Sequence, residues 1–509
     1  MADADLAPAP EDELDGQLRK GRLGVIGIVF FVVAAAAPLV GMTGAVPVAI
    51  VAGNGAGVPG AYLMVGLTLI IFSVGYAAMS SKVTNTGAFF AYVGRGLGIA
   101  PGVGSAFVSL VAYLAIQLAI FGFFGAVAGA KLDEQFGLTW NWYVWALIAW
   151  ALVLGLSLFS VDVGAKVLGV LMVLEVASLV ILSIAIFAKD TPEGIDWGAS
   201  FAPNNILVGG FAGSAGIALA FAFASFIGFE ATAIYGEESK DPKRTVPRAT
   251  YVAVSLITVL FAVASLAIVT GLGATTVIDR VVEISTVDGV PLTDPAAIVF
   301  TLADDYVGTW LGDTISWLVI SSLFAGLLAF QNSASRYFFA MGRGGVLPRM
   351  LDRTNKLGAP FVASIVTSVI SAAVIIFFAI TDKDPVLNLF FWFSGLAVVA
   401  IVLVEALVCL AVIAFFRRDH GDKRMWNTLI APGLAFVGLV IGLYLLMSRF
   451  GVLSGTAREG EDPTLVAWSL NTTGWVLVLL PFVLFIVGTI IGALRASTEN
   501  RDSIEDLVT

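Results

Sequence analysis

The sequence predicts an all-α integral membrane protein with 12 transmembrane helices, and three observations support this fold class. Of the 509 residues, 59% are hydrophobic and 13% are charged, whereas soluble globular proteins have roughly 45–50% apolar and about 25% charged residues. The apolar residues form unbroken runs, which excludes the alternating pattern of a transmembrane β-barrel. Lysine and arginine gather in alternate loops. A soluble enzyme, a nucleic-acid-binding protein and a disordered scaffold are therefore excluded.

Twelve apolar segments account for the predicted spans, and each is long enough to cross a bilayer as a helix. Helices are required because lipid offers backbone groups no hydrogen-bonding partner. In chain order the segments are 23–50, 56–80, 102–130, 141–160, 163–188, 211–235, 248–273, 308–334, 360–380, 386–416, 430–449 and 471–494.

The positive charges predict the orientation of these spans. With the N-terminus placed in the cytoplasm, 21 of the 27 lysines and arginines fall in cytoplasmic segments and six in external ones. Since positive charge is enriched in cytoplasmic loops, we expect a multi-pass protein of the cell membrane with both termini cytoplasmic. The cytoplasmic tails are then residues 1–22 and 495–509, and the long acidic loop near 274–307 is a solvated external loop.

The rare residue types bear on chemistry. The chain has one histidine, His420, and one cysteine, Cys409, which excludes an intrachain disulfide, bis-histidine haem and multi-histidine metal sites. No nucleophile–base set and no phosphate-binding P-loop is visible. We therefore expect no enzyme activity, no catalytic residue, no cofactor, no metal and no nucleic-acid partner.

The first segment contains residues that interrupt a helix in mid-span. Pro38 and Pro47 flank Gly41 and Gly44. Proline removes a helix donor and clashes with the preceding turn, while glycine tolerates an unwound backbone. We expect a break near Met42; a simple proline kink, common in membrane helices, is the alternative.

The sixth segment carries Ser225, Gly228 and Glu230 inside an apolar helix, which is weaker evidence for a break near residue 227. Transporters with inverted repeats bind substrate at mid-membrane between discontinuous helices. Freed amides can hold a carboxylate and freed carbonyls an ammonium group, so the two breaks together fit an amino acid. Breaks in spans one and six are where a five-plus-five repeat requires them.

Two longer stretches carry a family resemblance. They are IGFEATAIYGEESKDPKRTVPRA, from Ile227 to Ala249, and NSASRYFFAMGRGGVLPRMLDRTNKLGAP, from Asn332 to Pro360. With the glycine-bearing break of the first segment, they resemble the amino acid–polyamine–organocation (APC) superfamily of permeases over about residues 23–420. A departure from the family pattern is that the first break reads VGMTG where many members have a tighter GxG.

The resemblance implies a LeuT-type fold with discontinuous helices 1 and 6. Its parts would be a first five-helix repeat over residues 23–188, a second, inverted repeat over 211–416, and two additional helices over 430–494.

Three glutamates lie within the predicted spans, Glu175, Glu230 and Glu405. A charged carboxylate at a helix centre costs roughly 2.5–3.5 kcal/mol on insertion scales. The three must therefore line a wet path, pair with another group or remain protonated, and burial favours the protonated form.

The resemblance suggests roles for these glutamates. Glu175 falls where proton-coupled relatives commonly carry a lysine in helix 5, so we expect it to bind and release the proton near helix 1 or near Ser333 or Ser335. The alternative is a structural glutamate hydrogen-bonded between helices. Glu230 matches a frequent carboxylate of helix 6, which either reports proton state to the substrate site or caps the inner half-helix. Glu405 is expected to make a structural hydrogen bond.

The expected substrate pocket combines the two breaks with two further positions where some relatives contact substrate. Its members are Val40, Gly41, Met42, Thr43, Gly44, Gln117, Phe223, Ala224, Ser225, Phe226, Ile227 and Phe330.

These features favour a secondary active transporter that imports an amino acid, coupled to protons, by alternating access. Its partners would be the amino acid or amine, protons and membrane lipids. A polyamine or amine permease and an obligate exchanger are alternatives of the same fold. A channel or membrane sensor, from another class, fits less well because two broken helices occur in corresponding places and no soluble sensor domain is visible.

Overall fold

The computed structural model describes residues 21, 23–83, 87–158, 161–210, 213–236, 238–287, 289–290, 292, 294–418 and 421–496. The predicted tails lie outside these residues, apart from Gly21, Arg495 and Ala496. Glu237 of the family-like stretch and His420 also lie outside them. Within the described ranges the chain is helical, with loops and two isolated β-bridges.

Helical segments follow one another along the whole described chain. In the first half they are α1 (Val25–Ala36), α2 (Pro38–Val40), η2 (Gly41–Ala45), α3 (Val46–Val48), η3 (Ala49–Asn54), η4 (Gly55–Gly57), α4 (Val58–Ser80), α5 (Phe89–Leu97), α6 (Ile99–Phe136), α7 (Trp142–Ser157), α8 (Val161–Ala188), α9 (Trp197–Phe201), α10 (Pro203–Ile206), α11 (Ala215–Phe226) and α12 (Ala231–Ile234). In the second half they are α13 (Pro242–Leu272), α14 (Val277–Ser285), α15 (Ala297–Tyr306), α16 (Thr309–Arg343), η6 (Arg349–Asp352), α17 (Phe361–Ile380), η7 (Pro385–Phe390), α18 (Phe391–Arg417), η8 (Trp426–Ile430), α19 (Ala431–Ser448), α20 (Phe450–Ser454) and α21 (Thr472–Ala496).

The described helices have the length and composition of a membrane protein. Ten of them are long and apolar enough to cross a bilayer. The longest, Val25–Ser80, runs through the first two predicted segments, and Trp142–Ser157 is a shorter apolar helix. Each predicted segment overlaps one of these helices, so the chain is an all-α, multi-pass membrane protein.

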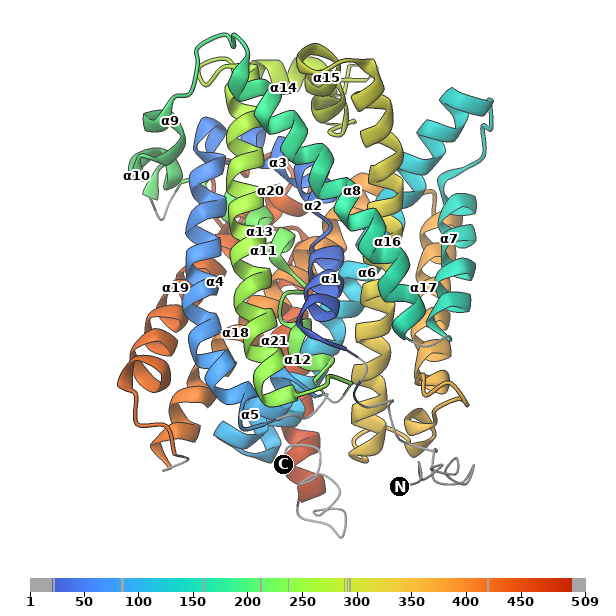
Figure 1. The fold of residues 1–509 in the computed structure, drawn as a ribbon, viewed down its shortest axis with the longest axis vertical. Coiled ribbons are helices and arrows are strands. Elements are labelled where there is room, and N and C mark those ends of the chain that lie inside the picture. Colours follow the sequence, from blue (N-terminus) through green and yellow to red (C-terminus); the bar gives the residue numbers. More distant parts are fainter. Residues whose placement is uncertain are drawn as a thin grey trace, which may run out of the picture.

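The long helices stand side by side in a bundle (Figure 1). Helix α6 packs against α16, α18 and α21, and α13 packs against α4. The α6–α21 contact is close because Gly104 faces Gly488, whose Cβ would come within 2.9 Å of the Gly104 backbone. Small residues let membrane helices approach in this way. Helices α5 and α12 lie at one end of the bundle and α14 and α15 at the other (Figure 1); we call these the α5 end and the α15 end.

The first helix is interrupted at Ala37, which has φ 43° and ψ 71°. The cause is Pro38, because proline has no N–H to donate and its ring pushes the preceding residue out of the α-helical region. The prediction of a break near Met42 was therefore wrong by five residues. Gly41–Ala45 remains helical, with the wider π geometry.

The second break lies at the predicted place. Helix α11 ends at Phe226, Ile227 is extended with ψ 129°, and Gly228 has φ 113°. The chain turns there before the short helix α12. Glycine at position 228 permits this turn, since its φ is one that other residues rarely adopt.

The loop predicted as solvated is largely folded. Residues 274–307 contain α14 and α15, and Ile298, Val299 and Leu302 of α15 are buried. Helix α15 packs against α16, α8 and η2, so the acidic residues of α14 and α15, which are Asp279, Glu283, Asp304 and Asp305, lie on a helical cover at the α15 end. At the α5 end, Leu23 forms a parallel β-bridge with Ser239.

Candidate functional site

The two helix breaks are in direct contact. A Cβ placed on Gly228 would lie 2.6 Å from the Cβ of Ala35, in the last turn of α1. This is shorter than any real separation of two such atoms, so only glycine permits the approach. The sequence thus brings two interrupted helices together through one glycine and one alanine.

A cavity of about 50 Å³ lies between the broken helices, and we call it the central cavity. It is lined by Ala35, Ala36, Ala37, Val40, Gly41, Ala45, Ile116, Ile120, Phe221, Ala224, Ser225, Phe330, Phe390 and Ser394. Among these described residues, two serines carry the polar side chains and none is charged.

Five of the twelve predicted pocket residues line the central cavity: Val40, Gly41, Ala224, Ser225 and Phe330. The other seven are not among its lining residues: Met42, Thr43, Gly44, Gln117, Phe223, Phe226 and Ile227.

The earlier break explains why Met42, Thr43 and Gly44 are not among the lining residues, whereas Ala45 is. Because the helix resumes at Pro38, Thr43 donates its hydroxyl to the Leu39 carbonyl at 2.7 Å. Gly44 packs against the ring of Phe123.

In the sixth segment, two of the predicted phenylalanines face other helices. Phe223 lies against Gly442 of α19, and Phe226 packs edge-on against Phe261 at a centroid distance of 5.5 Å.

Several lining residues were not predicted, and helix periodicity could have found some of them. Phe221 lies one turn before Ser225, and Ile116 and Ile120 lie on one face of α6, beside the predicted Gln117. Residues four apart share a helix face. By contrast, Phe390 and Ser394 come from η7 and α18, and the tertiary arrangement alone brings these residues to the cavity.

Glu175 binds the second half of the broken helix. The Leu39 N–H donates to Oε1 at 2.7 Å, and the Ser322 hydroxyl donates to the same oxygen at 2.7 Å. The carboxylate, 3% exposed, therefore joins α8 to α2 and α16. The expected contact with helix 1 is present, but the contact on α16 is Ser322 rather than Ser333 or Ser335.

The break leaves main-chain acceptors at the end of α1. A helical carbonyl normally accepts from the N–H four residues later. Pro38 has no N–H for the Ala34 carbonyl, and the Leu39 N–H, which would serve Ala35, donates to Glu175 instead. The two carbonyls are therefore without their usual donors, and Ala35 lines the central cavity.

The second break frees carbonyls in the same way. The Ile227 N–H donates to Ala224 at 3.2 Å, and the Phe229 N–H donates to Phe226 at 3.3 Å. The carbonyls of Phe223 and Ser225 consequently lose their usual donors. Such groups can accept hydrogen bonds from an ammonium ion.

Glu230, two residues after Gly228, stabilises the turn of the second break. Its Oε2 accepts the Gly228 N–H at 2.9 Å and its Oε1 accepts the Tyr113 hydroxyl at 2.7 Å. The Tyr76 hydroxyl donates to the Glu230 carbonyl at 2.6 Å. The carboxylate is 1% exposed, and these contacts fit the capping role more directly than contact with substrate.

Gln117 belongs to a polar contact outside the central cavity. Its side-chain N–H₂ donates to Gln331 Oε1 at 2.7 Å. Gln331 in turn donates to the Ser364 carbonyl and to the Ser368 hydroxyl. This chain of bonds ties α6 to α16 and α17.

Glu405 is buried at 2% exposure, and its Oε2 has no hydrogen-bond partner among the described residues. The structural hydrogen bond expected for it is therefore absent at that oxygen.

A buried ion pair lies at the α5 end and joins the two family-like stretches, one of which contains Glu238 and the other Arg336. Arg336 Nε donates to Glu238 Oε1 at 2.7 Å, with side-chain exposures of 1% and 4%. The Arg336 guanidinium also lies 5.0 Å from the ring centroid of Tyr235. Leu23 lies beside this ion pair, because its N–H donates to the Glu238 carbonyl at 3.1 Å.

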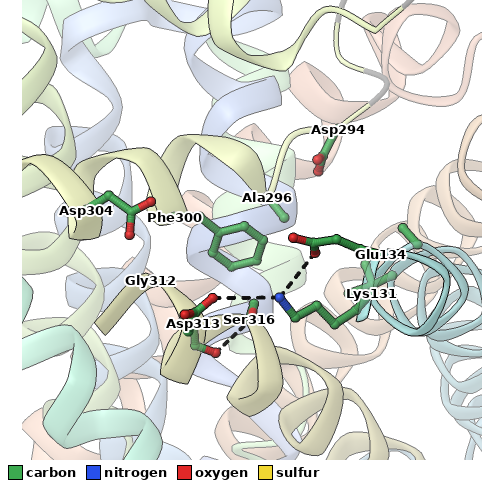
Figure 2. A pocket seen from close by; sticks show the side chains of 11 residues that line it. Lys131, Glu134, Asp294, Ala296, Phe300, Asp304, Gly312, Asp313 and Ser316 are labelled. Carbon is green, nitrogen blue, oxygen red and sulfur yellow. Dashed lines mark hydrogen bonds and ion pairs between the residues drawn. The ribbon is translucent and has the colours of Figure 1, made fainter. Parts of the chain in front are cut away.

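A second cavity, of about 230 Å³, lies between α6, α15 and α16. Figure 2 shows Lys131 reaching between two acidic side chains, Glu134 at 3.1 Å and Asp313 at 3.9 Å. Lys131 is 9% exposed, so this contact is a partly buried bridge from α6 to α16. Asp304 also lines the cavity, and burial, followed by the charge of Asp313, raises the pKa of its carboxyl. None of the predicted site residues lines this cavity.

The family model and the named permeases among the similar proteins indicate the same family. The amino acid permease family matches residues 27–501. The branched-chain amino acid permease BcaP of Lactococcus lactis is 25% identical over 60% of this chain and 65% of its own. An amino-acid permease of Candida albicans is 23% identical over 64% of this chain and 52% of its own, and an uncharacterised transporter of Legionella pneumophila is 23% identical over 79% and 83%.

Proposed function

The chain belongs to the amino acid permease family, and we propose that it imports an amino acid across the cytoplasmic membrane by alternating access, coupled to protons. Membership of this family makes it a membrane transporter rather than an enzyme. The proposal includes 12 spans in a LeuT-type arrangement, with repeats over residues 23–188 and 211–416, helices 11 and 12 over 430–494, and both termini cytoplasmic.

The observation that carries the proposal is the position of the Glu175 carboxylate. It accepts the amide of Leu39 at the start of the resumed helix and the hydroxyl of Ser322 on α16. Hydrogen bonds to an ionised group contribute about 1.5–3 kcal/mol each, whereas those between neutral groups contribute about 1 kcal/mol. Protonation therefore weakens the connection between the broken helix and its two neighbours.

This connection gives a physical basis for coupling. The freed carbonyl of Ala35, a residue that lines the central cavity, lies on the other side of the same break, where an ammonium group would bind. A change in the hydrogen bond from Leu39 to Glu175 moves α2 relative to the last turn of α1, which presents this acceptor. Proton binding and substrate binding are thus linked through one backbone interruption, and linkage of this kind is reciprocal.

Glu230 has a supporting role in this proposal. It fixes Gly228, which contacts Ala35, so the state of its carboxyl influences the same junction from the other helix. Its bond from Tyr113 connects this position to α6.

Uptake into proteoliposomes tests the coupling. With the membrane potential held at zero, a gradient of one pH unit supports about tenfold accumulation for one proton per substrate. We expect Glu175→Gln to bring substrate only to equal concentrations on the two sides. The glutamine oxygen can still accept from Leu39 and Ser322, so the fold is retained.

Glu405→Gln is the matched control, because Glu405 is equally buried, whereas its Oε2 has no hydrogen-bond partner among the described residues. We expect it to keep the accumulation of the unmodified protein. Accumulation against the gradient by Glu175→Gln would show that this residue does not couple the proton.

A further inference from the structure

We infer that the central cavity selects neutral amino acids with aliphatic side chains, an inference that rests on the proposed function. The composition of the cavity lining supports this selectivity. Among the described residues around the cavity, Ser225 and Ser394 provide the only polar side chains. Both hydroxyls are already engaged, since Ser225 donates to the Phe221 carbonyl and contacts the Tyr62 hydroxyl at 3.0 Å, and Ser394 donates to the Phe390 carbonyl.

The lining disfavours substrates with a charged side chain. A charge moved from water into an apolar site must be paired there, and otherwise binds poorly. The nearest acidic groups of the two breaks do not provide a partner. Glu175 faces Leu39 and Ser322, and Glu230 faces Gly228 and Tyr113. A polyamine, which needs more than one counter-charge, is disfavoured for the same reason.

The α-ammonium group of an amino acid has acceptors that do not depend on side chains. Of the carbonyls freed at the two breaks, those of Ala35 and Ser225 belong to residues that line the cavity, and they are suited to an α-ammonium group. All amino acids share this group, so these acceptors do not distinguish one amino acid from another. Discrimination within the class then falls to the side chains of the wall.

That wall is apolar and partly aromatic. Ile116 and Ile120 of α6, Phe330 of α16 and Phe390 of η7 face the cavity. Each methylene group buried against such a surface improves binding by about fourfold. The cavity measures about 50 Å³ in this structure, room for a few water molecules, so the wall must move to admit a substrate, and it must move furthest for a bulky aromatic one.

Phe390 sets the width of the cavity on one side. Its ring stacks on Phe123 at a centroid distance of 4.8 Å, with an angle of 22° between the planes. Phe393, three residues further on, is not among the lining residues and packs instead against Phe378 at 5.9 Å. The two phenylalanines form a matched pair for a test of selectivity.

The experiment measures uptake of labelled alanine, valine, leucine, phenylalanine, lysine, glutamate and putrescine, each at the same concentration, in proteoliposomes of the purified protein. We expect aliphatic amino acids to exceed lysine, glutamate and putrescine by about 100-fold. Phe390→Leu should raise the ratio of phenylalanine to alanine uptake by about tenfold, while Phe393→Leu should leave that ratio unchanged.

The possible outcomes distinguish a failure of the inferred selectivity from a failure of the proposed transport function. Lysine, glutamate or putrescine uptake equal to that of leucine would overturn the selectivity and leave amino acid transport intact. An equal effect of both phenylalanine variants would overturn the role given to the cavity wall. If folded protein transports no amino acid of any class, the proposed function itself fails.

Discussion

Replacing Glu238 with glutamine removes the counter-charge of a guanidinium that is 1% exposed. Breaking a buried ion pair by removing one partner costs 3–5 kcal/mol, at order-of-magnitude precision. Arg336 keeps its bond to the Asn332 carbonyl at 3.0 Å and its position over the Tyr235 ring. We therefore expect Glu238→Gln to destabilise the protein by an amount in the lower part of this range, about 3 kcal/mol.

This cost applies to the conformation in which the α5 end is closed. If water reaches both side chains when that end opens, the open conformation avoids the cost and gains population. About 3 kcal/mol corresponds to a shift of roughly 100- to 200-fold. Leu23, which donates its N–H to the Glu238 carbonyl, is the place to observe this opening.

Two measurements check the prediction. Titration with a denaturing detergent gives the free energy of unfolding, and the rate of thiol labelling at Leu23→Cys reports opening against a low background, since the native Cys409 is buried. The double variant Glu238→Gln/Arg336→Met should recover most of the lost stability, because no unpaired charge remains.

The exposed pair of Arg280 and Glu283 is the control. Its side chains are 47% and 67% exposed, so Glu283→Gln should cost less than about 1 kcal/mol. A cost for Glu238→Gln as small as that of this control would refute the energetic reasoning. Unchanged labelling at Leu23→Cys would refute the link between the ion pair and closure.

Two other substitutions test the contact between the two helix breaks and the second cavity. Gly228→Ala places a methyl group 2.6 Å from Ala35 in a backbone conformation unfavourable to alanine; strain and overpacking together should cost about 2–5 kcal/mol in unfolding assays, and an unchanged stability would contradict the close contact. Burial, and then repulsion from Asp313 and Asp305, raises the pKa of Asp304, so its ionisation opposes folding once the pH exceeds the ordinary aspartate pKa. Asp304→Asn should therefore give a small rise in Tm at pH 7 that shrinks toward about pH 4; the opposite trend would exclude this repulsion.

The first break shows how far local sequence determines the site. Pro38 requires an interruption because it lacks an N–H and restricts its predecessor, and this follows from the chain alone. What the chain alone does not show is that Glu175, from another helix, takes up the Leu39 amide that this interruption frees. Only the packing of α8 brings that carboxylate to the break.

The apolar segments, their approximate limits and the presence of three intramembrane glutamates follow from the sequence, because lipid demands long apolar helices and penalises charge. The pairing of Glu175 with Ser322, of Glu238 with Arg336, and of Gly228 with Ala35 depends on which helix faces meet. Such contacts join residues far apart along the chain, and no local period encodes them. The sequence thus determined that the chain crosses the membrane and where its helices weaken, while the tertiary structure decided which groups meet at those weak points.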